Sequence, residues 1–226
     1  MTWTVLVTGG SSGLGAAVVE AVGAAGGKAL VLDRVPPSIE VDHEVVDLAD
    51  SRAAEAAVRR AAERAGGLDA VVTAAGMDRC GVLTEVPGEE WDRVVLVNLV
   101  GTAAVVRAAL PYLKEPHGRV VTVASTLGLK AVSDATAYCA SKFGVVGFTR
   151  ALAAETAGRV GVTLLVPGGM ATHFFDDRDE RYRPPRDAKL NRPQDVAATV
   201  LLALSQPPGC EVRELVVAPA TDTSWP

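Results

Sequence analysis

Short runs of β-branched residues alternate with alanine-rich stretches along this chain of 226 residues. Parallel strands need a long crossover between them, usually a helix, so the alternation predicts one α/β domain with a seven-stranded parallel sheet. The expected strands are Thr4–Val7, Ala29–Leu32, His43–Val46, Ala70–Thr73, Arg119–Val123, Gly161–Val166 and Val212–Val217. The expected helices are Leu14–Ala25, Arg52–Ala65, Glu89–Leu113, Ala137–Ala157 and Asp195–Leu204.

Two connections break this alternation. Between the second and third expected strands, the nine residues from Arg34 to Asp42 contain no helical pattern. They span at most about 30 Å, enough to return along a strand of about 17 Å without a helix, so we expect part of the sheet to lack cover. The segment of residues 170–192 is polar, charged and proline-containing. It follows a strand end, where open α/β sheets bind ligands, and this favours a lid or substrate loop over an ordinary solvated connection.

Composition and charge exclude several classes of protein. The net charge of −5 is spread over the chain without a basic tract, which argues against nucleic acid as a partner. The longest uncharged apolar stretch, Val94–Val106, is too short to span a bilayer, and no signal sequence precedes the first strand, so we expect a cytoplasmic protein without a membrane anchor. Cys80, Cys139 and Cys210 are scattered, which predicts neither a disulfide framework nor a metal site.

The first expected strand runs directly into the sequence Thr8-Gly9-Gly10-Ser11-Ser12-Gly13-Leu14-Gly15. Glycines at a strand-to-helix turn let the backbone approach a pyrophosphate, and the free N–H groups at the helix start stabilise its charge. We therefore expect a dinucleotide phosphate site here. The residues assigned to it are Gly9, Ser11, Ser12, Gly13, Leu14 and Gly15. The alternative is a glycine turn needed only for packing.

The same loop also spells Gly9-x-Ser11-x-Gly13, the nucleophile elbow of an α/β-hydrolase. Only eight residues precede Gly9, which leaves no room for an upstream oxyanion loop. The last histidine, His173, lies on the expected substrate loop. The hydrolase is therefore the weaker alternative.

Asp33 closes the second expected strand, where a carboxylate hydrogen-bonds a ribose diol and repels a 2′-phosphate. This favours NAD(H) as the cofactor. The neighbouring Arg34 favours the alternative, NADP(H), because a guanidinium accepts a phosphate. Asp33 and Asp47 could also be plain turn residues, and Asp50 is positioned to cap a helix.

Tyr138 and Lys142 are four residues apart and share one helix face, and Ser125 ends the preceding strand. A free tyrosine has a pKa of about 10, and a nearby ammonium together with an oxidised nicotinamide would lower it. Tyr138 would then exchange a proton with an alcohol or carbonyl near neutral pH, while Ser125 orients the substrate oxygen. The alternatives are a half-buried helix aromatic for Tyr138 and a solvated lysine for Lys142.

Asn98 interrupts the apolar sequence Val94–Val100. A polar amide inside an apolar helix is costly unless it is paired. It could be a structural residue bonded to backbone, or it could lie behind the active site and hold a water or bend the helix. The sequence does not decide between the two.

Over nearly its whole length the chain resembles the classical short-chain dehydrogenase/reductase family. The matching pieces are Thr8-Gly9-x-x-x-Gly13-Leu14-Gly15, Asp47-Leu48, Asn98, Ser125, Tyr138-x-x-x-Lys142 and Pro167-Gly168 with Thr172. The resemblance implies a Rossmann sheet with strand order 3-2-1-4-5-6-7. It also implies a homodimer or homotetramer, joined through the helices expected at Glu89–Leu113 and Ala137–Ala157.

The resemblance further implies a catalytic tetrad of Asn98, Ser125, Tyr138 and Lys142. Tyr138 would be the acid/base, and Lys142 would hold the nicotinamide ribose, lower the tyrosine pKa and join a proton relay through water at Asn98. Asp47 and Leu48 would contact adenine. The nicotinamide side would be lined by Pro167, Gly168, Met170 and Thr172.

Three places depart from the family pattern. Thr73-Ala74-Ala75-Gly76 stands where many members have Asn-Asn-Ala-Gly, so backbone packing of Ala74, Ala75 and Gly76 against the cofactor is expected without the supporting amides. The crossover around Pro36-Pro37 is short, and Glu214–Pro219 lacks a glycine-rich closing motif.

These observations predict an oxidoreductase that moves hydride between NAD(H) and a small-molecule secondary alcohol or its ketone. Within the family, the alternative is an NADP(H)-dependent carbonyl or 3-oxoacyl reductase. Outside it, the alternative is a non-catalytic dinucleotide-sensing protein on the same fold.

Overall fold

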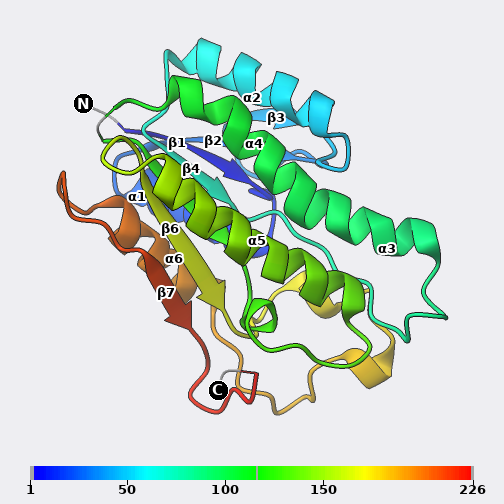
Figure 1. Ribbon diagram of the computed structural model, residues 1–226. Helices are drawn as coiled ribbons and strands as arrows, with labels where there is room; N and C mark the ends of the chain where they lie inside the picture. Colours follow the sequence, from blue (N-terminus) through cyan, green and yellow to red (C-terminus); the bar gives the residue numbers. More distant parts are fainter. Residues whose placement is uncertain (1–2, 116, 225–226) are drawn as a thin grey trace.

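A seven-stranded parallel sheet forms the centre of the computed structural model, which describes residues 3–115 and 117–224 (Figure 1). The strand order is β3-β2-β1-β4-β5-β6-β7, which confirms the Rossmann sheet expected from the sequence. The strands are β1 (Thr4–Thr8), β2 (Lys28–Asp33), β3 (Asp42–Val45), β4 (Ala70–Thr73), β5 (Arg119–Val123), β6 (Gly161–Pro167) and β7 (Glu214–Val217). Each lies within two residues of its predicted bounds.

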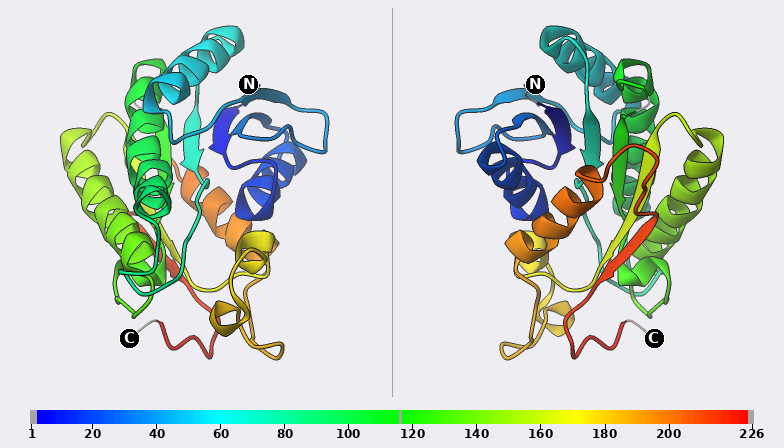
Figure 2. Two further views of the ribbon diagram at one scale, coloured as in Figure 1. Left: turned by 90° about the vertical axis from the view of Figure 1, so that its right-hand side faces the viewer. Right: turned by 90° about the vertical axis from the view of Figure 1, so that its left-hand side faces the viewer.

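Helices cover both faces of the sheet, with α1 and α6 on one face and α2, α4 and α5 on the other (Figure 2). The helices are α1 (Gly13–Ala24), α2 (Ser51–Ala65), α3 (Gly88–Val95), α4 (Thr102–Ala109), α5 (Thr136–Glu155) and α6 (Pro193–Leu204). Short 3-10 turns occur at Leu110–Tyr112, Thr126–Gly128, His173–Phe175 and Glu180–Tyr182. As predicted, Asp50 caps α2, because its carboxylate accepts from the N–H groups of Arg52 and Ala53.

Burial along the strands follows from this two-sided cover. Every residue of β1, β4 and β5 is buried, whereas the edge strands β3 and β7 alternate between more and less exposed positions. Central strands of a parallel sheet read as continuous apolar runs because both of their faces meet helices. Because all seven strands are parallel, their carboxyl ends lie at one edge of the sheet, together with the loops that follow them.

The connection from β2 to β3 contains no helix, as the sequence predicts. Asp42 pairs with Leu30, and the missing cover leaves Val35, Ile39 and Val45 about half exposed, at 52%, 45% and 56%. Ion pairs from α2 to Asp42 and Glu44 hold the edge strand from its other face.

The helix expected at Glu89–Leu113 has the predicted extent but is not uniform. It runs from α3 through a π-helical turn, Leu96–Gly101, into α4 and a 3-10 turn. The π turn contains Asn98, and π turns are often found at functional sites. Periodicity could not reveal it, because one inserted residue barely disturbs an apolar pattern.

By length and composition the 25 residues Gly88–Tyr112 could cross a membrane. Half of their most apolar window is buried inside the protein, where the helix packs against α2 and α5. Such burial is typical of the core helix of a folded domain. The prediction from Val94–Val106 alone therefore underestimated the length of this apolar helix.

Candidate active site

A cavity of about 1270 Å³ opens at the carboxyl ends of the strands. It collects most of the residues that the sequence assigned to a cofactor or to catalysis. Those that line it are Gly9, Ser12, Gly13, Leu14, Asp33, Arg34, Asp47, Leu48, Ala74, Ala75, Gly76, Ser125, Tyr138, Lys142, Pro167, Gly168, Met170 and Thr172. Ser11, Gly15 and Asn98 do not line the cavity, so they have no direct contact with its interior.

The glycine loop needs its glycines for two different reasons. Gly9 has φ +70°, and a Cβ there would lie 2.8 Å from the Cα of Ala75. A Cβ on Gly15 would overlap the carbonyl oxygen of Gly9. Packing therefore explains Gly9 and Gly15, while Gly13, with φ +52°, turns the chain into α1. Packing thus explains part of the glycine pattern, and phosphate binding by this loop stays a prediction.

The start of α1 fits a phosphate. Ser12 precedes the helix in an extended conformation, and its side chain makes no capping hydrogen bond. Ser12, Gly13 and Leu14 all line the cavity. Uncapped N–H groups at a helix start facing a cavity form an anion site.

Ser11 points away from this cavity. Its hydroxyl donates to the carbonyl of Val35 at 2.8 Å, and its N–H donates to the Asp33 carboxylate at 3.0 Å. The side chain of His173 is 89% exposed and pairs with Asp176 on the same loop. Among the described residues, Ser11 is hydrogen-bonded to Val35 and Asp33 and to no histidine, which argues against the nucleophile-elbow alternative.

Asp33 has a structural role at the border of the cavity. Besides accepting from Ser11, it accepts from the N–H of Val35 at 3.3 Å, so it ties the glycine loop to the end of β2. The exposed Arg34 follows it on the cavity. Asp33 and Arg34 therefore both face the place where an adenosine ribose would lie.

Asp47 and Leu48 lie beside them, after β3. Burial raises the pKa of Asp47, but the N–H of Ala49 and the Arg93 guanidinium, 2.6 Å away, outweigh it and hold that pKa below its usual value. Asp47 is thus an ionised, hydrogen-bonded carboxylate and more than a plain turn residue.

The turn after β4 is rigid despite its missing amides. The N–H of Ala75 donates to the Thr8 hydroxyl at 3.2 Å, and the close approach of Gly9 to Ala75 leaves no space between them. Contacts with β1 and the glycine loop therefore support the turn in place of the missing amides.

Ser125, Tyr138 and Lys142 are brought together at the end of β5. The Ser125 hydroxyl accepts from the N–H of Leu127, which starts a 3-10 turn. The Lys142 ammonium lies 5.6 Å from the centre of the Tyr138 ring and donates to the Val123 carbonyl at 2.9 Å. All three side chains belong to buried residues, so neither the solvated lysine nor the half-buried tyrosine is correct.

Burial dominates the acidity of this pair. It raises the pKa of Tyr138 to about 12, against an opposing hydrogen bond with Ser125. It lowers the pKa of Lys142 to about 8, against the opposing charge of Asp78. Desolvation of the phenolate thus sets the direction of the tyrosine pKa, and the lowering expected from Lys142 together with an oxidised nicotinamide stays a prediction.

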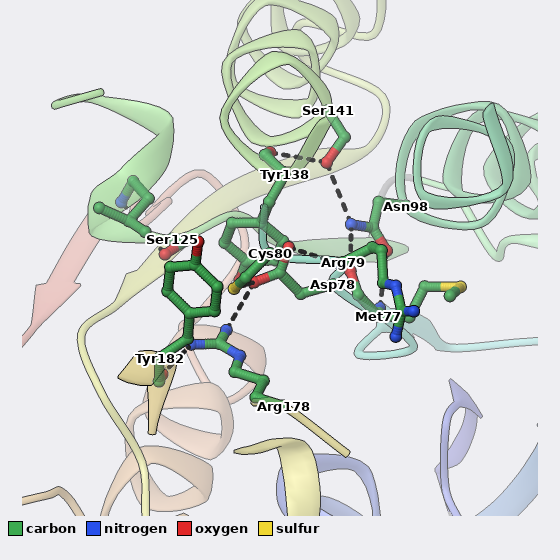
Figure 3. A network of polar contacts seen from close by, with 11 residues as sticks. Met77, Asp78, Arg79, Cys80, Asn98, Ser125, Tyr138, Ser141, Arg178 and Tyr182 are labelled. Atoms are coloured by element: carbon green, nitrogen blue, oxygen red, sulfur yellow. Dashed lines mark hydrogen bonds and ion pairs between the residues drawn. The ribbon is translucent and has the colours of Figure 1, made fainter. Parts of the chain in front are cut away.

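Asn98 lies behind these residues in a closed network of polar contacts (Figure 3). Its amide accepts from the N–H of Met77 and donates to the Met77 carbonyl, both at 2.8 Å, and it donates to the Ser141 hydroxyl at 3.0 Å. Ser141 in turn donates to the Tyr138 carbonyl at 2.8 Å. Asn98 is thus structural, yet it connects the π turn to the helix that carries Tyr138.

Asn98 and Lys142 both approach the side of Gly76 on which a Cβ would lie. A Cβ on Gly76 would be 3.5 Å from the Asn98 Oδ1 atom and 3.6 Å from the Lys142 Nζ atom. Sequence reasoning missed Ser141, although it lies inside the motif that contains Tyr138. Its spacing of three from Tyr138 was the available signal.

The segment that the sequence marks as a substrate loop, residues 171–192, contributes much of the cavity lining opposite the glycine loop. The Phe174 ring lies 5.8 Å from the Tyr138 ring. Arg178 forms an ion pair of 2.6 Å with Asp78, which follows β4. No sequence pattern predicted this pair, since the two residues are 100 positions apart.

Pro219 and residues 221–224 also line the cavity, which no sequence pattern predicted. Asp222 accepts from the N–H of Gly169 at 3.4 Å, and the Ser224 hydroxyl contacts that of Thr126 at 2.6 Å. Lys130 donates to the Thr223 carbonyl at 2.9 Å. These contacts hold residues 222–224 against the loops that follow β5 and β6.

Within the residues that the structure describes, no three His, Cys, Asp or Glu side chains are grouped as metal ligands.

The fold and the cavity together define a dinucleotide-binding α/β protein with a buried tyrosine–lysine pair. Comparison with known proteins agrees: the model of a family described as short chain dehydrogenase matches residues 3–183. The chain therefore belongs to the short-chain dehydrogenase/reductase family of oxidoreductases.

Two proteins of known sequence are examples of its relatives. A D-beta-hydroxybutyrate dehydrogenase of Cupriavidus necator is 33% identical, over 91% of this chain and 84% of the relative. A short-chain reductase, NovJ, of Streptomyces niveus is 31% identical, over 93% and 90%.

Solved structures share the fold. A short chain dehydrogenase from Burkholderia cenocepacia, in complex with NADP, has a TM-score of 0.83 at 26% identity, with 96% of each chain covered. An alcohol dehydrogenase from Thermococcus sibiricus, complexed with 5-hydroxy-NADP, has a TM-score of 0.86 at 23% identity, again with 96% of each chain covered.

Proposed function

We propose that this oxidoreductase transfers hydride between a nicotinamide dinucleotide, NAD(H), and a small-molecule secondary alcohol or its ketone. The observation that carries the proposal is the burial of Ser125, Tyr138 and Lys142 together in the cavity that the glycine loop borders. Proton-transfer groups beside a dinucleotide site are what carbonyl reduction requires.

The residues present fit such a cofactor. The uncapped start of α1 suits the pyrophosphate, and Asp33 with Asp47 and Leu48 suits the adenosine. The backbone from Ala74 to Gly76 and residues Pro167, Gly168, Met170 and Thr172 would border the nicotinamide. When bound, the cofactor supplies or accepts the hydride.

The protein groups handle the proton. Ser125 would hydrogen-bond the substrate oxygen and orient it toward Tyr138, which gives its proton to that oxygen during reduction and takes it back during oxidation. Lys142, with a pKa of about 8, can exchange a proton near neutral pH. Its position beside Gly76 and the Asn98 network provides a route away from the substrate.

For the cofactor, Asp33 supports NAD(H), because its carboxylate would repel a 2′-phosphate. Two observations favour NADP(H) as the second candidate. Arg34 is exposed on the cavity, and the Burkholderia structure is a complex with NADP. In that case the chain is an NADP(H)-dependent carbonyl or 3-oxoacyl reductase.

The first experiment titrates the purified protein with NADH and with NADPH and follows the fluorescence of the bound nicotinamide. We expect tight NADH and weak NADPH binding. The reverse order would mean that Arg34 outweighs Asp33 and would favour the reductase. Binding of neither would contradict the dinucleotide site.

The second experiment screens secondary alcohols with NAD, 3-hydroxybutyrate among them because a hydroxybutyrate dehydrogenase is a relative. Tyr138→Phe should lower turnover by about 10²- to 10⁴-fold, since it removes the proton donor. Cofactor affinity should be unchanged. Turnover that survives Tyr138→Phe would contradict the role of Tyr138, and absence of Tyr138-dependent turnover with any carbonyl or alcohol would favour the dinucleotide-sensing protein.

We also propose a cytoplasmic homodimer or homotetramer that needs neither nucleic acid nor a membrane. The helices expected to pair carry exposed apolar side chains at Leu96, Val100 and Phe143. Light scattering of the purified protein would measure its mass. A monomer at micromolar concentration would contradict the assembly.

A further inference from the structure

The substrate loop is tied to the body of the protein above Tyr138 by one ion pair. The Arg178 Nη2 atom lies 2.6 Å from the Asp78 Oδ2 atom. Figure 3 shows the two side chains joined in this contact. The Asp78 side chain is only 2% exposed and that of Arg178 is 16% exposed. Breaking a buried pair by removing one partner is strongly destabilising, because it leaves an uncompensated charge, so this contact is unlike the exposed pairs elsewhere on the loop.

Asp78 is fixed independently of the loop. Its carboxylate accepts from the N–H of Arg79 at 2.7 Å and from the thiol of Cys80 at 3.2 Å. Burial, with the charge of Asp78, raises the pKa of Cys80 to about 12, so the thiol stays protonated and remains a donor. The Asp78 carboxylate, on the segment that follows β4, is thus held in position to accept a hydrogen bond from Arg178.

Arg178 is held on the loop by two aromatic rings. Its guanidinium carbon lies 5.2 Å from the centre of the Phe174 ring and 4.7 Å from that of Phe175. Cation–π contacts of this kind are strongest when desolvated. Phe174 also lies against the Tyr138 ring, so a chain of contacts leads from Arg178 through Phe174 to the tyrosine.

We propose that Asp78 and Arg178 are positioning residues, whose ion pair closes the substrate loop and holds Phe174 over Tyr138 for the reaction. The inference rests on the proposed function for its catalytic meaning, but loop closure is measurable without any substrate.

The pair also sets the charge around Tyr138. The Asp78 carboxylate raises the pKa of Tyr138, and the Arg178 guanidinium lowers it. The other groups near the phenol are Ser125, Cys139 and the Lys142 ammonium. Closure therefore brings in the cation that neutralises Asp78, whereas an open loop leaves Asp78 facing Tyr138 alone.

Limited trypsin digestion tests closure. Arg181, Arg186 and Lys189 are exposed cleavage sites within the loop, and cleavage there requires local opening. We expect Asp78→Asn and Arg178→Met each to raise the cleavage rate at least about tenfold. The double variant should show less than the product of the two single effects, because the two residues act through one contact.

Asp176→Asn is the matched control. Asp176 forms an ion pair with His173 on the same loop, but the two side chains are 62% and 89% exposed. Its cleavage rate should equal that of the wild type. Unchanged cleavage in Asp78→Asn and Arg178→Met, with NADH affinity and circular dichroism like those of the wild type, would overturn the proposal. Should Arg178→Met not fold, Arg178→Lys replaces it in the comparison of single and double variants.

The pH profile of alcohol oxidation separates positioning from a purely structural role. Using the secondary alcohol oxidised fastest in the screen, Asp78→Asn should shift the rising limb of turnover to lower pH and Arg178→Met to higher pH. Shifts in the same direction, or none, would overturn the electrostatic part of the proposal. If no alcohol is oxidised and no ketone is reduced, the proposed function fails, while the trypsin cycle still decides whether the pair closes the loop.

Discussion

The two sides of the cavity are built in different ways. On the dinucleotide side, the glycine loop and the turn after β4 are fixed by backbone atoms in close contact, as between Gly9 and Ala75. On the substrate side, residues 171–192 and 218–224 are held by polar side-chain contacts such as those of Asp78 and Asp222. We call these two segments the substrate cover.

The difference follows from what each side does. A phosphate site must present N–H groups in fixed positions, and backbone packing without free space provides this. A substrate cover must open and close, and a few hydrogen bonds and one ion pair can be broken without disturbing the sheet. Substitutions should therefore act sterically on the first side and through lost polar contacts on the second.

The largest effect is expected from Gly15→Ala on the dinucleotide side. The new Cβ would overlap the carbonyl of Gly9, so the loop must shift. We expect a loss of at least about 3 kcal/mol in the free energy of unfolding, because overpacking against backbone cannot relax. NADH binding should be lost as well.

Gly23→Ala makes the same change in the same helix where nothing lies within 4 Å of the new Cβ. It should raise the free energy of unfolding by about 0.5–1 kcal/mol, since glycine is costly inside a helix. Urea unfolding and NADH titration measure both variants. Equal behaviour of the two would refute the steric account of the loop.

A smaller effect is expected where the two sides meet, at Lys142. Burial lowers its pKa to about 8 in the folded protein, against about 10.4 in the unfolded chain. Between these values the unfolded chain binds more protons, so the contribution of Lys142 to stability rises as the pH rises from about 8 to 10.4. The gain should be about 2 kcal/mol.

Lys142→Met removes this titration and leaves the other groups in place. The difference in unfolding free energy between wild type and variant, measured in urea from pH 7.5 to 10.5, isolates the lysine. The unfolding free energy of the wild type should increase relative to that of the variant as the pH rises. A difference independent of pH would show that the buried lysine keeps its ordinary pKa.

The smallest effect is expected from Asp222→Ala in the substrate cover. It removes acceptors for the N–H groups of Gly169 and Ser224, at 3.4 Å and 2.7 Å. We expect a local loss of about 1 kcal/mol, seen as hydrogen exchange about fivefold faster in residues 218–224. NADH affinity should fall far less than in Gly15→Ala. A global loss of stability would mean that this segment is part of the core.

Most of the fold could be read from local patterns. The strands and helices lie within two residues of their predicted bounds, and the crossover without a helix followed from the length of residues 34–42. The π turn at Asn98 was missed because it differs from an α turn only in its hydrogen bonding. No residue type marks that difference in the sequence.

The candidate site divides in the same way. The glycine loop and the Ser125–Tyr138–Lys142 set were found because their members have fixed spacing within or next to one element. The rise that burial causes in the tyrosine pKa could not be predicted from spacing, because burial depends on everything packed around Tyr138, including Phe174 from a distant loop.

The sequence by itself determined the alternation of strands and helices, the position of the glycine loop and the tyrosine–lysine spacing. Each depends on neighbours a few residues apart, and backbone geometry fixes these. Only the tertiary structure decided that Asp78 meets Arg178 and that residues 221–224 line the cavity. Such contacts join residues far apart in the chain, and they exist only once the sheet has brought its loops to one edge.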